Sequence, residues 1–191
     1  MGMNWKGLLM KLNLLFFVLV SFLLISAFAS SSYGEEVGRP KWGFSVFGGF
    51  NSQSNRPHLI QGGFLPRWNL ALFNRLDLEL EGNFSYYWIS EGKNLYLLGA
   101  NANLLFKPIQ WKDGSLFIIG GAGLGYNNSN GKVHLIERSH LTGILQAGPG
   151  IYIRIKKGLW LRGEYRYQHI SDPLHNDQGF NTHIFMMGLS F

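Results

Sequence analysis

Residues 76–88 alternate between apolar and polar side chains, and this alternation constrains the fold more than any other feature of the chain. Side chains of a β-strand point to opposite faces in turn, so the pattern predicts one strand that separates two different environments. A strand of a globular protein usually has about 5–6 residues, and this one is much longer. The apolar face carries Leu76, Leu78, Leu80, Phe84, Tyr86 and Trp88, and the polar face carries Asp77, Glu79, Glu81, Asn83 and Ser85.

The same alternation recurs along the rest of the chain and predicts about eight strands, with no internal repeat and no domain linker. Turn-like segments separate the strands at 51–55, 91–94, 112–114 and 156–158, and 127–138 has the composition of a longer polar loop. The expected strands are Trp42–Asn51, roughly Pro57–Trp68, Leu76–Trp88, Tyr96–Phe106, Leu116–Tyr126, Leu141–Ile155, Leu159–Ser171 and Asn181–Phe191.

The N-terminal segment has a different character. Lys6 and Lys11 precede an apolar run, Leu12–Phe28, and Ala27-Phe28-Ala29 has the small-x-small form of a signal peptidase site. The run is shorter than the roughly 20 residues of a membrane-spanning helix, which is the alternative interpretation. We therefore expect residues 1–29 to be a cleaved signal peptide and residues 30–191 to form one domain.

Two kinds of barrel fit such strands. A soluble, lipocalin-like barrel has its apolar side chains inside, whereas a membrane barrel has them outside and fills its lumen with polar groups. The strands approach the 9–11 residues that a tilted spanning strand needs. Polar faces carry both signs of charge, Tyr and Trp lie at strand ends, and the chain ends on Phe191, which resembles the end of bacterial outer-membrane barrels. The sequence therefore predicts an all-β, eight-stranded antiparallel transmembrane β-barrel of the outer membrane.

The expected topology places one polar group of residues on the lipid-facing wall. An even number of strands returns both ends to the periplasm, so the seventh strand runs outward to the leaflet that holds lipopolysaccharide. Along that strand, His169 and Ser171 share the outward face with Tyr165 and Tyr167. Counting back from Phe191 places Asn181 on the outward face of the neighbouring strand. We expect His169, Ser171 and Asn181 to lie close together.

These residue types suit acyl transfer. An imidazole can take the proton of a serine hydroxyl, which then attacks an ester carbonyl, while a third group fixes the tautomer of the ring. An oxyanion stabiliser is also needed, and the loop at 172–179 can supply backbone N–H groups, although Pro173 has none. The alternative is an interfacial histidine and a strand-end serine with no chemical role.

The segment His169-Ile170-Ser171-Asp172, followed by Asn176-Asp177-Gln178-Gly179-Phe180-Asn181, resembles the C-terminal signature of the PagL family, the lipid A 3-O-deacylases. The resemblance implies release of the acyl chain ester-linked at position 3 of lipid A, with no metal and no cofactor. By position, Ser171 would be the nucleophile and His169 the base. Asn181 takes the place of the acidic residue, Asp172 and Asp177 are alternative acids, and Gly179 belongs to the loop near the oxyanion.

Several alternatives remain open at this stage. A non-catalytic barrel with a structural, adhesion or lipid-binding role fits the same strands, and a homodimer is as compatible with the sequence as a monomer. His58, His134 and His140 lack metal-ligand spacing, and His183 faces outward where it could contact a lipid head group. Asp77, Glu79 and Glu81 are expected to pair inside the lumen. The expected partner is lipopolysaccharide, and no motif indicates nucleic acid.

Overall fold

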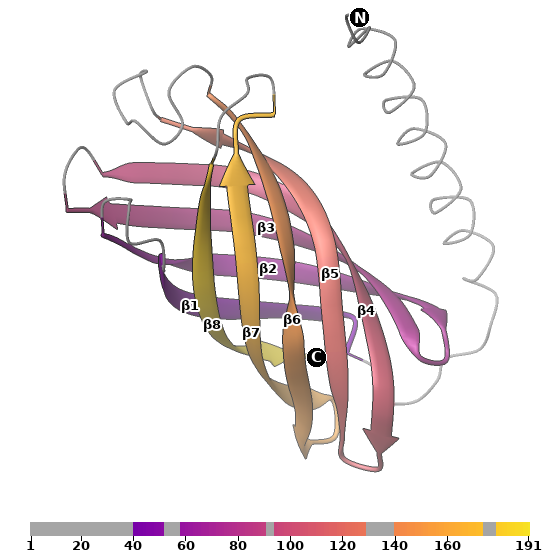
Figure 1. Ribbon diagram of the computed structural model, residues 1–191. Coiled ribbons are helices and arrows are strands. Elements are labelled where there is room, and N and C mark those ends of the chain that lie inside the picture. Colours follow the sequence, from indigo (N-terminus) through magenta and orange to yellow (C-terminus); the bar gives the residue numbers. More distant parts are fainter. Residues whose placement is uncertain (1–39, 52–57, 91–93, 129–139, 174–178) are drawn as a thin grey trace, which may run out of the picture. The chain divides into compact units, whose positions relative to one another are not determined.

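The computed structural model describes residues 40–51, 58–90, 94–128, 140–173 and 179–191. These residues form eight strands (Figure 1). The predicted signal peptide, residues 1–29, lies outside the described residues. Within the described part of the chain, no helix is long and apolar enough to span a bilayer. The strands are β1 (Trp42–Asn51), β2 (Leu59–Phe73), β3 (Leu76–Ile89), β4 (Leu95–Trp111), β5 (Gly114–Asn127), β6 (Leu141–Lys156), β7 (Leu159–Ser171) and β8 (Phe180–Ser190).

The strands close into an antiparallel barrel in chain order, and β8 pairs with β1 (Figure 1). The first and last residues of the barrel meet, because the amides of Lys41 and Trp42 both donate to the carbonyl of Phe191, at 3.0 and 2.9 Å. Closure leaves no edge strand. Every strand therefore satisfies its backbone groups within the sheet, which is what a hydrocarbon solvent requires.

The two faces of the strands have the predicted environments. Phe84 and Trp88 are 49% and 50% exposed on the outer wall, whereas Glu79 and Glu81 are 0% and 2% exposed inside. An aromatic ladder, Phe44–Phe64–Phe84, crosses the outer wall with ring centroids 5.9 and 6.4 Å apart. The apolar side chains thus face the lipid, and the prediction of a membrane barrel rather than a lipocalin-like one is confirmed.

Buried ion pairs fill the middle of the lumen. Arg162 bonds to Glu79 and Glu164, and it also donates to the Tyr152 hydroxyl at 2.6 Å. Arg166 donates two hydrogen bonds of 2.8 Å to the Glu81 carboxylate and also forms an ion pair with Glu164. Each carboxylate therefore meets a guanidinium inside a closed wall. The predicted pairing of lumen carboxylates is confirmed for these residues, and Glu164 points inward as its parity indicates.

The charges in the middle of the lumen are equal in number. Lys107 pairs with Asp77, and Arg67 has its nearest carboxylate, Glu79, at 4.0 Å. Amide side chains extend the network, with Asn101 donating to Glu81 at 2.9 Å. The described charged residues in the middle of the lumen are Arg67, Lys107, Arg162 and Arg166 with Asp77, Glu79, Glu81 and Glu164, and Asp172 is a further buried carboxylate at the loop end. The interior is a packed polar core, as expected for a barrel with eight strands.

Apolar clusters share the interior of the barrel with the ion pairs. The cluster toward the loop end contains Ile170 and Phe180, which come from the adjoining ends of β7 and β8. Its other members are Leu59, Tyr87, Ile89, Leu95, Leu97 and Ile144. Because Ile170 and Phe180 are anchored inside, the residues on either side of them must point outward. This packing fixes the orientation of the residues at the end of β7.

The second strand is longer than its sequence suggested. β2 ends at Phe73 rather than Trp68, and Asn74-Arg75 forms the turn to β3. The extra residues pair with β3, for example Asn69 with Glu79 and Ala71 with Asp77. Apolar residues at both parities, Leu70 to Phe73, conceal the alternation there. The cross-strand partners, not the local pattern, set the end of this strand.

Because the buried charges of the lumen pair with each other, we expect Arg162→Leu to lower the stability of the barrel strongly. The change leaves Glu79 and Glu164 short of a cation in a buried site, so we expect the free energy of unfolding in detergent to fall by about 3–5 kcal/mol. The matched control is Arg154→Leu, whose partner Asp113 lies 3.7 Å away in an exposed pair, and which should cost about 1 kcal/mol or less. Urea unfolding curves measure both. Equal losses would contradict the structural role of the network.

Candidate functional site

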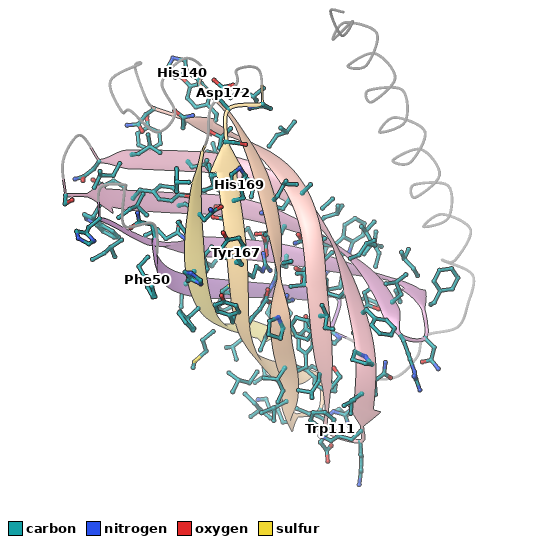
Figure 2. The ribbon with its side chains drawn as sticks, in the orientation of Figure 1. Phe50, Trp111, His140, Tyr167, His169 and Asp172 are labelled. Carbon is teal, nitrogen blue, oxygen red and sulfur yellow. The ribbon has the colours of Figure 1, made fainter. Side chains whose placement is uncertain are left out.

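The last residues of β7 alternate between the core and the outer wall. Ile170 is buried in the apolar cluster at the loop end, and Asp172 is 3% exposed on the same side. His169 and Ser171 have the opposite parity and are partly exposed on the outer wall. Figure 2 shows His169 and Tyr167 along β7, with Asp172 near the loop end and Trp111 at the other end of the barrel. The predicted outward orientation of His169 and Ser171 is confirmed.

The register between β7 and β8 brings Asn181 to His169. The two residues are direct cross-strand partners, next to the pair Ile170–Phe180. Their side chains form a hydrogen bond of 2.7 Å between His169 Nδ1 and Asn181 Oδ1. A carboxamide oxygen accepts, so the ring nitrogen Nδ1 carries the proton and Nε2 keeps its lone pair. The imidazole is thus held in the tautomer that a general base needs.

Gly179 closes the loop directly onto this pair. Its φ of +57° lies in the left-handed region, which favours glycine. A Cβ at this position would lie 2.2 Å from the carbonyl oxygen of Ile170, 2.8 Å from Ser171 Cβ and 3.1 Å from His169 Cε1. Only a residue without a side chain allows the backbone to approach so closely. The backbone of Gly179 therefore packs against both His169 and Ser171.

The other neighbour of Ser171 also lacks a side chain. Gly143 of β6 is its cross-strand partner, and Leu145 is the partner of His169. A Cβ on Gly143 would meet the Ser171 carbonyl oxygen at 3.5 Å and Pro173 at 3.6 Å. The position next to Ser171 on β6 thus holds no side chain, whereas the position next to His169 holds an exposed leucine.

Asp172 and Asp177, the alternative acids predicted from the sequence, do not join His169 on the outer wall in the described structure. Asp172 faces the interior, so it is not on the wall that carries His169, and the Nδ1 atom of His169 is already bonded to Asn181. Asp177 lies outside the described residues. Among the described residues, no hydrogen bond joins the His169 ring to the Ser171 hydroxyl. The two side chains share a face two residues apart.

A polar pair lies next to this site on the same wall. The Tyr165 hydroxyl bonds to His183 Nδ1 at 2.7 Å, and the two rings stack with centroids 5.9 Å apart. The ring of Phe50 flanks His183 at 5.6 Å. Sequence analysis placed His183 on the outer face but did not find its partner, although Tyr165 has the matching parity. The hydrogen bond to Tyr165 gives His183 Nδ1 a partner, because a polar ring nitrogen without one has an unfavourable free energy in a lipid environment.

Comparisons with known proteins agree with this architecture. A family model described as "Outer membrane protein beta-barrel domain" matches residues 15–191. No curated protein sequence gives a significant match. The structure of the outer membrane enzyme PagL has a TM-score of 0.52 at 14% identity, over 77% of this chain and 98% of PagL. Ail, the attachment invasion locus protein of Yersinia pestis, has a TM-score of 0.48 at 13% identity, over 80% of this chain and 98% of Ail. At 14% identity the likeness to PagL shows the fold alone.

The two glycines with positive φ make a matched pair of variants. Gly179→Ala adds a Cβ that collides with the Ile170 carbonyl and with Ser171, whereas a Cβ at Gly158, with a φ of +77°, meets nothing within 4 Å. We expect Gly158→Ala to cost about 1–2 kcal/mol, the strain of the left-handed conformation alone. Gly179→Ala should lower the free energy of unfolding further. Equal losses in urea unfolding would show that the loop does not pack on the site.

Proposed function

This chain belongs to the outer membrane protein β-barrel domain family. From the residues at the end of β7 and the start of β8, we propose that it hydrolyses the acyl ester at position 3 of lipid A, with Ser171 and His169 as nucleophile and base. The chain is an outer-membrane protein, and its strands cross that membrane. The observation that carries the proposal is the hydrogen bond of 2.7 Å between His169 and Asn181 on the outer wall. Ser171, two residues after His169 on the same face, supplies the hydroxyl that the proposed reaction needs as its nucleophile.

The first step of the proposed reaction is a proton transfer. His169 Nε2 takes the proton of the Ser171 hydroxyl as the oxygen attacks the ester carbonyl of the acyl chain. The tetrahedral intermediate collapses when His169 returns the proton to the sugar oxygen, which leaves. The acyl-serine is then hydrolysed by water, with His169 again as base. One ester bond is broken, and a free fatty acid and a sugar hydroxyl are released.

The loop backbone is proposed to stabilise the oxyanion. Gly179 brings main-chain atoms against both Ser171 and His169, and glycine at this point permits that approach. Backbone N–H groups fixed in this way cost no reorganisation when charge develops. Asp172 points inward, which keeps its negative charge off the wall where the oxyanion would form. We therefore assign Asp172 no part in the reaction.

The position of the site suits a substrate that stays in the membrane. His169 and Ser171 end a strand at the loop end of the barrel, where the ester linkages of an outer-leaflet glycolipid lie near the boundary between sugar and acyl chain. The aromatic wall around Tyr167 and Phe50 offers an apolar surface for acyl chains below it (Figure 2). The likeness of residues 169–181 to the lipid A deacylase signature and the fold shared with PagL support the same substrate.

A non-catalytic barrel is the second candidate. The third residue is a carboxamide rather than a carboxylate, and the described residues show no hydrogen bond between His169 and Ser171. In an unliganded enzyme such bonds are often long and tighten only with substrate. The experiments below separate the two functions.

Loss of either reacting group should abolish the activity. We expect Ser171→Ala and His169→Asn to reduce release of fatty acid from lipopolysaccharide in detergent by about 10³-fold or more. Matched controls are Ser90→Ala and His140→Asn, which change the same residue types at the loop end of the barrel. The products are identified by mass spectra of lipid A. Unchanged lipid A acylation by the wild-type protein would favour the non-catalytic function, and full activity of Ser171→Ala would defeat the assignment.

Asn181 should limit the rate, because a carboxamide orients the imidazole but does not stabilise imidazolium with a charge. Asn181→Asp or Asn181→Glu is therefore expected to raise kcat by about tenfold or more. Asn181→Leu removes the acceptor and should lower it. Initial rates against lipid A in micelles measure the effect, and heat-modifiable migration on gels checks the fold. Equal rates in the acidic and leucine variants would show that residue 181 does not act through His169.

A further inference from the structure

The described cations outside the lumen are all at one end of the barrel. This is the end with the short turns 74–75, 112–113 and 157–158, where the first and last strands also meet, and it faces the periplasm. We call this group of cations the basic rim. It consists of Lys41, Arg75, Lys112, Arg154, Lys156 and Lys157.

The positive charge of the basic rim is poorly compensated in the described residues. The one acid there is Asp113, and Arg154 already pairs with it at 3.7 Å. Arg154 also lies over the ring of Trp160, 4.6 Å from its centroid. The carboxylates in the middle of the lumen already lie against lumen cations, and the remaining buried carboxylate of the described residues, Asp172, is at the opposite, loop end of the barrel. The rim therefore carries a net positive charge toward its surroundings.

Aromatic residues place these cations at the depth of lipid head groups. Trp42 and Trp68 are cross-strand partners on the outer wall, and their rings stack with centroids 5.7 Å apart. Trp111 is exposed at the end of β4, directly before Lys112 (Figure 2). Tryptophan on the outer wall of a membrane barrel marks the boundary between hydrocarbon and head groups.

The short turns keep the charges close to this boundary. Arg75, Lys112 and Lys157 lie in two-residue turns, and Lys156 directly precedes the third of these turns. Fields of exposed charges decay over about 8–10 Å at physiological salt. A lipid phosphate at the membrane surface is within this range of the basic rim. A partner in the periplasmic space would have to lie directly against the membrane surface, at the depth of these tryptophans, to be within the same range.

We propose that the basic rim binds anionic phospholipids of the periplasmic leaflet, with lysine and arginine side chains on the phosphates and the tryptophans beside the acyl chains. The chemistry that it recognises is a head group with net negative charge, such as phosphatidylglycerol, rather than a zwitterionic one. Ammonium and guanidinium groups donate charge-assisted hydrogen bonds to phosphate oxygens. The proposal concerns the opposite end of the barrel from His169 and does not depend on the proposed hydrolase function.

The test uses the whole protein folded into vesicles of equal parts phosphatidylglycerol and phosphatidylcholine. Native mass spectrometry of the extracted protein counts the lipids of each kind that remain bound. We expect phosphatidylglycerol to be retained about fivefold or more over phosphatidylcholine, since each cation near a membrane surface contributes substantially to binding. The variant Lys112→Gln/Lys156→Gln/Lys157→Gln should lose this preference, and 1 M salt in the vesicle buffer should weaken it in the wild type.

Two further variants keep the test specific. Lys112→Arg/Lys156→Arg/Lys157→Arg keeps the charge and should keep the preference, and Asp113→Asn should increase it. All of the changed side chains are exposed, and heat-modifiable migration checks that each variant folds. Equal retention of the two lipids by the wild type would overturn the proposal. An undiminished preference in the glutamine variant would overturn the assignment to these residues.

Discussion

A chain that crosses a membrane with strands must satisfy every backbone hydrogen bond within its own sheet, and the rest of this structure depends on that constraint. The closed order from β1 to β8 meets it without an edge. Closure also divides all side chains into two sets, one against lipid and one inside a narrow lumen. The outer set is mostly apolar, and the middle of the lumen carries four cations and four carboxylates, most of which pair with each other.

The same division explains why the proposed site lies where it does. Ile170 and Phe180 are held in the apolar cluster of the lumen, so their neighbours His169, Ser171 and Asn181 are forced onto the outer wall. The strand register then makes His169 and Asn181 direct partners, and Gly179, in the left-handed conformation, brings its own backbone onto His169 and Ser171. The proposed substrate, a glycolipid, resides in the same membrane as this wall.

Much of this could be predicted from the sequence because a period of two is short and robust. The strand faces at Leu76–Trp88, the inward orientation of Glu164 and the meeting of His169 with Asn181 all follow from parity. The end of β2 could not be predicted, since its last residues are apolar at both parities and only pairing with β3 defines them. The hydrogen bond between Tyr165 and His183 could not be predicted either. Parity places both side chains on the outer wall but does not say which pairs of side chains on adjacent strands touch. The inward burial of Asp172 could not be predicted, because it depends on the backbone conformation just after the last residue of β7.

The central claim is that Ser171 is a nucleophile activated by His169 on the outer wall. Reaction of the folded protein in detergent with a lipophilic fluorophosphonate, followed by peptide mass mapping, tests it most directly. We expect one phosphonyl adduct, on Ser171, that forms in the wild type and not in His169→Asn. A wild-type protein that remains unlabelled at Ser171, or labelling at Ser171 that does not depend on His169, would contradict it.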